Sequence, residues 1–244
     1  MNSEVKEGIG WLYGVYTPTS QEVIFNRIPA LGTTRVLQDG RKFRFIRTAV
    51  DAVAGQVMGA PIALAVITSG STAALVGDTQ VEITRSGTTL NQLAGGFITF
   101  TNTAGVEATY GIVRNTAADA DNQVVVYLDN PLVGAVAAGD ALILIPPMYG
   151  ACIINTTLTI PVGVAIRPST AATDATTNYM WVQTYGVGSV VITTASGILD
   201  GVAVMATTAG SVVVADGTLR QLGQALCIDV VDDGDVAPIY LTIE

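Results

Sequence analysis

Residues that could carry out chemistry are few in this chain, and none of them stands in a catalytic pattern. Histidine is absent, and the two cysteines, Cys152 and Cys227, lie 75 positions apart. Histidine is the side chain most used for acid–base catalysis near neutral pH, and a zinc site needs closely spaced cysteines or histidines. We therefore expect a protein that is not an enzyme, with both cysteines buried as small apolar side chains rather than joined in a disulfide.

Two acidic segments, DVVDDGD at Asp229–Asp235 and AADADN at Ala117–Asn122, could offer oxygen ligands to a cation. Neither has the alternating ligand positions and the terminal glutamate of an EF-hand loop, and Asp and Asn also build hairpin turns. Asp232 and Asp233 are the only adjacent acids, and neighbours on a strand point to opposite faces, unlike a glycosidase pair. We interpret both segments as turns and expect no metal and no cofactor.

Other short motifs carry no further chemistry. Asn155-Thr156-Thr157 fits the N-glycosylation pattern, but a Thr-rich chain produces it by chance and no export signal accompanies it. No nucleophile elbow, phosphate-binding loop or dinucleotide fingerprint occurs, and the serines and threonines have no histidine to activate them.

Charge is divided unevenly along the chain, whose net charge is −9. Residues 1–50 hold seven basic groups against four acids, a net of +3, and residues 51–244 hold four against sixteen, a net of −12. So acidic a body repels nucleic acid. The basic residues could dock on an acidic protein surface or could simply solvate the outer face of a hairpin. The candidate docking residues are Arg27, Arg35, Arg41, Lys42, Arg44 and Arg47.

The elements that would position these residues are β-strands. Half of the residues are hydrophobic but only 6% are aromatic, and the apolar content is largely Val, Ile, Leu and Ala interleaved with Thr and Gly. From about Gly77 to the end, runs of period two are separated by Gly, Asn, Asp and Pro clusters. The pattern predicts an all-β, antiparallel protein of sandwich or barrel domains with an extended N-terminal arm. The most apolar window, Val53–Thr68, is too short and too interrupted to cross a membrane.

Domain boundaries follow from this pattern. We expect an arm and hairpin over 1–50, a connecting segment over 51–65 that forms a short helix or an ordered loop, a middle β domain over 66–160 and a C-terminal β domain over 161–244. Arg35–Ala49 reads as a hairpin, because Asp39-Gly40 between two strands favours a type I′ turn with positive φ at both central residues.

The phrase NYMWVQTYGVGSVVITT, Asn178–Thr194, holds one of the two tryptophans in an alternating run that a Tyr-Gly turn interrupts. Trp181 and Tyr185 have the same parity and share a face if one strand carries both. They would then either fill the core of the C-terminal domain or form a subunit contact.

The order of phrases resembles a family of tailed-bacteriophage virion proteins similar to head decoration, or cement, proteins, over nearly the whole chain. The phrases that carry the resemblance are LYGVYTPTSQE, LGTTRVLQDGRKFRFIRTA, GGFITFTNTAGVEATYGIVRNT, VVVYLDNPLVGAV, ALILIPPMYGACI, PVGVAIRPS, NYMWVQTYGVGSVVI, LGQALCIDVVDDG and IYLTIE. None of them is a catalytic signature.

The resemblance implies a structural role on the head surface, after synthesis in the host cytoplasm. The implied partner is the major capsid protein, with the chain acting as a homotrimer and binding neither nucleic acid nor membrane. Two alternatives stay open, namely a tail or baseplate component and a carbohydrate-binding virion surface domain. A sugar site would need exposed aromatic residues, and only Tyr179, Trp181 and Tyr185 cluster in the sequence.

Overall fold

The fold is all-β and antiparallel, as the alternation predicts. The computed structural model describes residues 29–61, 64–67, 72–101, 109–157, 159–169, 178–193, 198–207, 209–217, 220–226 and 234–243. These ranges contain 16 strands and no helix, hence none of a length and apolarity that could cross a membrane, and every ladder between named strands is antiparallel. The predicted N-terminal arm, with Arg27, lies outside the described residues.

The chain forms two compact units. Unit 1 combines the described residues up to Ala60 with those from Ala151 onward, and unit 2 runs from Pro61 to Gly150. The N-terminal hairpin belongs to the same unit as the C-terminal strands because β2 (Lys42–Thr48) pairs along β12 (Asn178–Val191). Periodicity specifies a strand but does not specify so distant a partner.

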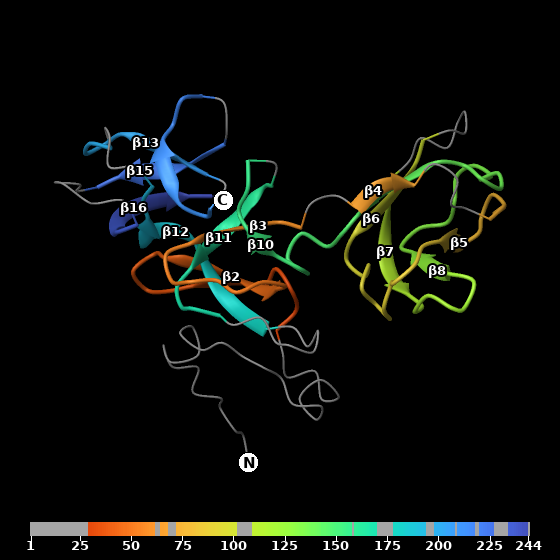
Figure 1. Cartoon of the computed structure of the whole chain (residues 1–244). Helices are drawn as coiled ribbons and strands as arrows, with labels where there is room; N and C mark the ends of the chain where they lie inside the picture. The colour runs from red at the N-terminus through yellow and green to blue at the C-terminus, as the bar shows by residue number, and fades with distance from the viewer. Residues whose placement is uncertain are drawn as a thin grey trace, which may run out of the picture. The chain divides into compact units, whose positions relative to one another are not determined.

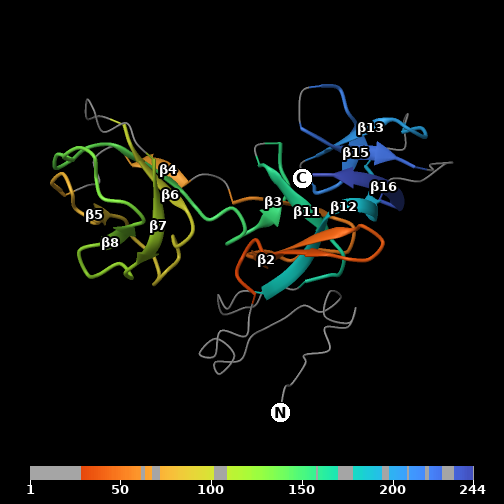
Figure 2. The same ribbon diagram turned by 180° about the vertical axis from the view of Figure 1, so that it is seen from behind.

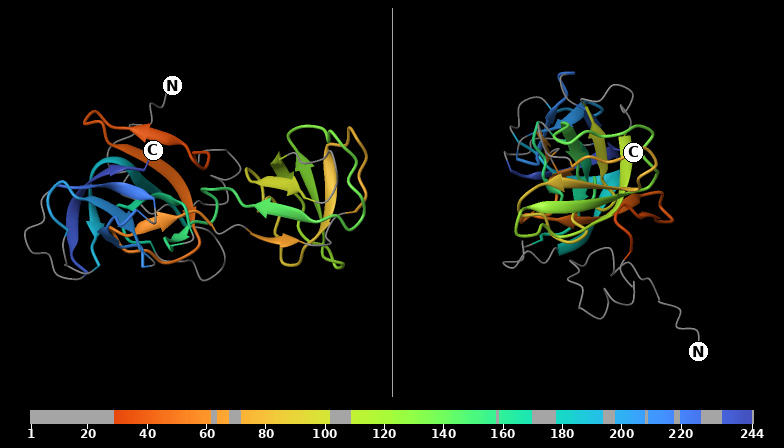
Figure 3. Two further views of the ribbon diagram at one scale, coloured as in Figure 1. Left: turned by 90° about the horizontal axis from the view of Figure 1, so that it is seen from above. Right: turned by 90° about the vertical axis from the view of Figure 1, so that its right-hand side faces the viewer.

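Unit 1 is built on one curled, half-barrel sheet in which β12 is the organising strand (Figures 1 and 3). The strands follow the order β10-β3-β11-β12-β16-β15-β13-β14, and β2 joins β1 to β12. The remaining strands are β1 (Thr34–Val36), β3 (Val57–Gly59), β10 (Ile153–Ile154), β11 (Pro161–Ala165), β13 (Ala203–Ala206), β14 (Val212–Val214), β15 (Gln221–Ala225) and β16 (Val236–Thr242).

β12 is one continuous strand of 14 residues, where the sequence predicted two strands separated by a turn. Gly186 has a φ of +85° and lets the strand bend without reversing. The register against β2 shifts between Gln183 and Tyr185, which is the signature of a β-bulge. β12 therefore pairs with β2 along its first half and with β16 along its second half.

Among the described residues of unit 1, two distinct apolar clusters stand out. The larger one packs residues from β11, β12, β13, β15 and β16 against one another, and it includes Val190, Leu222 and Ile239, all fully buried. The smaller one is aromatic and consists of Phe43, Phe45 and Trp181, with partly buried residues around it. The apolar residues that alternate along these strands thus pack into two separate clusters on one sheet.

The β1–β2 hairpin forms where the sequence places it, but with a different turn. The N–H of Gly40 donates to the carbonyl of Leu37 (3.0 Å), and the N–H of Leu37 donates to the carbonyl of Arg41 (2.9 Å). Only Gly40 has positive φ, at +85°, whereas a type I′ turn also requires it at Asp39. The connection is therefore a three-residue loop closed by a glycine in the left-handed region.

The segment between the hairpin and unit 2 holds a strand rather than the expected helix or loop. β3 pairs with both β10 and β11, so the Ala-rich sequence around it is drawn into the sheet of unit 1. Tertiary pairing here overrides the helix propensity of alanine. Residues 62–63 lie outside the described ranges.

Unit 2 is a six-stranded antiparallel sheet with its own core (Figures 1 and 2). Fifteen buried side chains form one cluster, which includes Ile98, Phe100, Val126 and Leu144. Every one of its strands had been anticipated from period-two runs except β4. The strands follow the order β4-β9-β6-β7-β8-β5, with β4 (Leu64–Ile67), β5 (Gln80–Thr84), β6 (Phe97–Phe100), β7 (Thr109–Asn115), β8 (Gln123–Leu128) and β9 (Leu142–Ile145).

Candidate functional site

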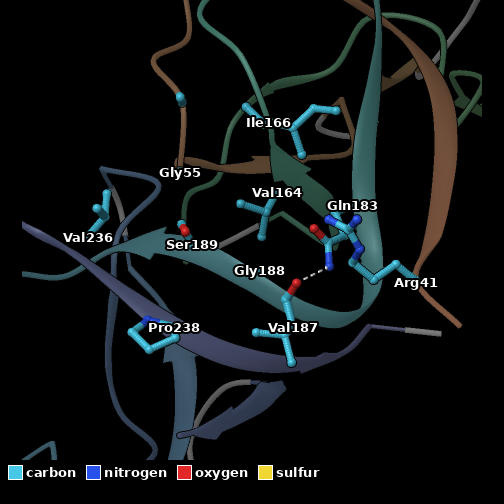
Figure 4. A pocket seen from close by; sticks show the side chains of 12 residues that line it. Arg41, Gly55, Val164, Ile166, Gln183, Val187, Gly188, Ser189, Val236 and Pro238 are labelled. Atoms are coloured by element: carbon cyan, nitrogen blue, oxygen red, sulfur yellow. Dashed lines mark hydrogen bonds between the residues drawn. The ribbon is translucent and has the colours of Figure 1, made fainter. Parts of the chain in front are cut away.

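A cavity of about 320 Å³ in unit 1, which we call the Arg41 pocket, is lined by one of the predicted docking residues. It lies where β11, the bend of β12 and β16 meet the end of the β1–β2 hairpin (Figure 4). Its walls are mainly apolar side chains and backbone, and its polar side chains are few. The lining residues are Arg41, Ala54, Gly55, Val164, Ala165, Ile166, Gln183, Val187, Gly188, Ser189, Val236 and Pro238.

Gln183 holds the bend of β12 that forms one wall of the pocket. Its Nε2 donates to the carbonyl of Val187 at 2.8 Å, as Figure 4 shows, and to the carbonyl of Tyr185 at 3.1 Å. These two carbonyls lie where the ladder between β12 and β2 ends, so the buried amide supplies a donor to them. The side chain of Gln183 thus holds this part of the pocket wall in place.

Arg41 supplies the positive charge of the pocket and is itself anchored within the hairpin. Its Nε lies 2.7 Å from Oδ2 of Asp39, and its backbone N–H donates to Oδ1 of the same carboxylate at 3.1 Å. These hydrogen bonds from Arg41 lower the pKa of Asp39 below its ordinary value. The Asp39 side chain is exposed and that of Arg41 is half-buried, so solvent screens the pair, which orients the guanidinium and adds little stability.

The other predicted docking residues of the hairpin are half-buried and do not form a free cationic face. Arg44 donates from Nη1 to the carbonyl of Gly32 (2.8 Å), and Lys42 places its Nζ 5.0 Å from the ring centre of Tyr185. Arg35 lies in β1 opposite Phe43. Arg47 lies in β2, where its carbonyl accepts the N–H of Cys152 at 2.8 Å. Of the predicted docking residues that the structure describes, Arg41 alone lines the pocket.

Tyr185 takes part in a small polar-aromatic group beside this region. Its ring meets that of Tyr240 edge to face at 5.5 Å, and the Tyr240 hydroxyl donates to the Tyr185 hydroxyl at 2.9 Å. This hydrogen bond is the main reason that the pKa of Tyr240 is raised. Tyr240 follows an apolar run near the C-terminus, and nothing in the sequence pairs it with Tyr185. The register between β12 and β16 places Tyr240 opposite Val187, and so diagonal to Tyr185 on the neighbouring strand.

Trp181 lies in the smaller aromatic cluster and is 5% exposed. Its ring centre is 5.2 Å from that of Phe45, which in turn stacks on Tyr179 at 5.6 Å. Across β2, Trp181 lies opposite Phe45 and Tyr185 lies opposite Lys42, because of the intervening bulge. The bulge thus gives Trp181 and Tyr185 different surroundings, although their parity predicted a shared face.

The chemical candidates from the sequence that the structure describes are part of the core or of a turn. Burial raises the pKa of the fully buried Cys152 to about 12, which keeps the thiol protonated. Asn155 is 2% exposed and accepts a hydrogen bond from Thr159 through Oδ1 (3.0 Å), so it cannot receive a glycan in the folded chain. Asp119 closes a hairpin loop by accepting the backbone N–H groups of Asp121 and Gln123. Cys227, Asp232 and Asp233 lie outside the described residues.

A second hollow, of about 270 Å³, lies beside β5 in unit 2. It is lined by polar residues that include Asp78, Gln80 and Glu82. The Asp78 carboxylate accepts the N–H of Leu75 at 2.7 Å and so closes a turn. No group of three or more His, Cys, Asp or Glu that could hold a metal occurs among the residues that the structure describes.

The chain matches no protein-family model, no curated protein and no solved structure in comparisons with known proteins.

Proposed function

We propose that this chain is a non-enzymatic capsid decoration protein, which binds the major capsid protein on the outer surface of a tailed-phage head and stabilises the lattice. In this proposal it is made in the host cytoplasm, acts as a homotrimer and resides on the head surface of the virion. The resemblance of its phrases to such proteins motivates the proposal. The observation that carries it is the Arg41 pocket, because that pocket places one of the predicted docking residues on an open, mainly apolar cavity.

The pocket has the properties of a receptor for a protruding segment of another protein. Apolar walls such as Val164 and Val187 favour an apolar side chain, and burying that side chain contributes roughly 1.5 to 3 kcal/mol. Arg41 and Ser189, which also line the pocket, carry side chains that can donate hydrogen bonds to an acceptor on the partner. Contacts of this size are weak singly and become strong when many copies bind one lattice.

The binding test uses purified heads that lack this protein. Full-length protein is expected to sediment with the heads and to occupy regular lattice sites in electron micrographs. Arg41→Glu is expected to weaken binding about tenfold or more, because it removes the donor and repels an acidic partner.

A matched control for this test is Arg220→Glu, which changes net charge equally and lies away from the pocket, where Arg220 donates to the carbonyl of Ile243 (2.7 Å). Equal loss of binding in both variants would indicate a nonspecific charge effect and would remove the pocket from the proposal. Failure of the full-length protein to bind heads would overturn the proposal itself.

The alternative of a tail or baseplate component shares this protein-binding chemistry, and the same assay with purified tails tests it. The alternative of a sugar-binding domain receives less support, because the ring of Trp181 is buried and Tyr179 is stacked on Phe45. A sugar platform needs a ring face open to solvent. We therefore place carbohydrate binding behind the two protein-binding roles.

A further inference from the structure

The second half of β12 has one edge paired with β16 and the other edge turned toward the Arg41 pocket. In an antiparallel ladder, alternate residues direct their backbone N–H and C=O groups to opposite sides of the strand. The N–H of Ile192 donates to the carbonyl of Asp235, next to β16, at 2.8 Å. The even-numbered residues of 187–192 therefore face β16, and the odd-numbered residues face the pocket.

Ser189 offers an unpaired stretch of backbone at this edge. On either side of it, the carbonyl of Val187 accepts a hydrogen bond from Nε2 of Gln183 (2.8 Å), and the N–H of Val191 donates to the carbonyl of Gly55 (2.9 Å). The backbone N–H and C=O of Ser189 have no such partner among the described residues, and Ser189 is exposed. An open strand edge of this kind is a template for another extended chain.

The side-chain oxygen of Gln183 adds an acceptor on the wall of the pocket. Gln183 is 3% exposed and uses its Nε2 for two carbonyls, but its Oε1 accepts no hydrogen bond from the residues that the structure describes. A β-carbon built on Gly188 would lie 3.1 Å from this oxygen, so the lack of a side chain at Gly188 leaves space beside it. Figure 4 shows both residues in the lining. Because a buried acceptor needs a donor, an occupant of the pocket should carry one.

These groups match the backbone of an extended peptide. Each peptide unit carries one N–H donor and one C=O acceptor, so a peptide can pair with the backbone of Ser189 and supply the donor for Oε1 of Gln183. Its side chain would then meet apolar walls such as Val164. Strand addition at a sheet edge, with pockets for alternate side chains, is a recurring mode of peptide recognition. The volume of about 320 Å³ suits the tip of a short segment.

We propose that the Arg41 pocket binds an extended segment of the capsid lattice by adding it as a short strand beside Ser189, with one apolar side chain inside the cavity. This inference rests on the proposed function and names the chemistry of its partner. Each described strand of the chain is already held in a ladder of its own sheet. A second copy could not supply one of these strands without breaking that ladder, so we assign the segment to the partner protein.

Ser189→Pro tests the backbone contact in the full chain. Proline removes the N–H that faces the pocket and no hydrogen bond to β16, because Ser189 lies opposite Pro238 and its N–H points away from that strand. We expect binding to heads that lack this protein to weaken about tenfold or more. Ser189→Ala is the matched control, since it removes the hydroxyl and keeps the N–H, and it should weaken binding a few-fold at most. Circular dichroism verifies that each variant folds.

Hydrogen exchange tests the same contact without a variant. In the free parent chain, the N–H of Ser189 is expected to exchange quickly, because it has no partner among the described residues. On heads, its exchange is expected to slow about tenfold or more, because the added strand accepts this hydrogen bond. Mass spectrometry of the free and the head-bound chain measures the difference, and this measurement decides the question if Ser189→Pro does not fold.

The outcomes separate this inference from the proposed function. If the parent binds heads but the N–H of Ser189 exchanges equally fast in both states, only water occupies the edge, and the decoration role stands without strand addition. If Ser189→Ala weakens binding as much as Ser189→Pro, the hydroxyl makes the contact and strand addition is wrong.

Two further outcomes concern the source of the segment. If the parent does not bind heads, the decoration role fails and this inference fails with it. If light scattering shows that the parent is an oligomer and Ser189→Pro a monomer, the added strand comes from a second copy, and the assignment to the capsid lattice is wrong.

Discussion

Gly186 packs directly against Arg41, so the bend of β12 and the end of the β1–β2 hairpin specify each other. A β-carbon built on Gly186 would lie 2.9 Å from Cγ of Arg41 and 3.3 Å from its Cα. The φ of Gly186 is +85°, a value that strains other residues. The absence of a side chain therefore allows both the bend and the close approach that brings Arg41 to the pocket.

Gly186→Ala is expected to destabilise unit 1 by more than about 2 kcal/mol, from backbone strain together with the contact against Arg41. Gly40→Ala is the matched control, because Gly40 has the same φ of +85° and open space around its would-be β-carbon. We expect it to cost only about 1 kcal/mol. Urea unfolding of both variants measures the difference, and equal losses would show that the Arg41 contact is unimportant.

Trp181→Phe is expected to change the free energy of unfolding by about 1 kcal/mol or less. The buried indole N–H of Trp181 has no hydrogen-bond partner among the described residues, so removing it offsets part of the lost volume. Trp181→Ala should cost about 3 to 5 kcal/mol through the cavity it leaves against Phe43 and Phe45. Denaturant titration compares the two, and a large loss in Trp181→Phe would indicate that the indole makes an essential polar contact.

Cys152 should make stability depend on pH in alkaline solution. Its thiol has a pKa of about 12 when folded, against the ordinary value of 9.0. Above pH 9 the unfolded chain therefore binds fewer protons than the folded chain, and stability falls by about 1.4 kcal/mol per pH unit until the folded thiol also ionises. The experiment compares Cys152→Ala with its parent between pH 8 and pH 10, both carrying Cys227→Ser. Parallel pH profiles would contradict the raised pKa.

Removal of residues 61–150 should leave unit 1 folded. Gly59 lies opposite Ile153 in the β3–β10 ladder, so the two ends of the excised segment are adjacent and a four-residue Gly-Ser loop can join them. The described clusters of unit 1 contain no residue of unit 2, and unit 2 has its own core.

The excised chain and the isolated 61–150 fragment are each expected to unfold cooperatively on heating, as followed by circular dichroism. Loss of β structure in either would show that the two units depend on each other for folding. In the head-binding assay, the excised chain should retain the contact of the Arg41 pocket, because every residue that lines it belongs to unit 1.

The amino-acid sequence by itself determines where many of the strands and turns of this protein lie. Alternation over segments such as Gln123–Leu128 and Val236–Thr242 predicts strands, because side chains on a strand point alternately to core and solvent. Asp39-Gly40 predicts a reversal, because glycine reaches the left-handed region without strain. The lack of histidine and the isolated cysteines excluded the usual triads and zinc sites.

Only the tertiary structure decided which strands pair with one another. Pairing of β2 with β12 joins residues more than a hundred positions apart, and that pairing moves the hairpin into the C-terminal unit and brings Arg41 beside Gln183. The bulge beyond Gln183 separates Trp181 from Tyr185, although their spacing is that of one face. The spacing of apolar residues and the residue types in turns reflect the local conformation of the backbone. Register, bulges and pockets arise instead from hydrogen bonds and packing between distant segments, and no local sequence pattern contains that information.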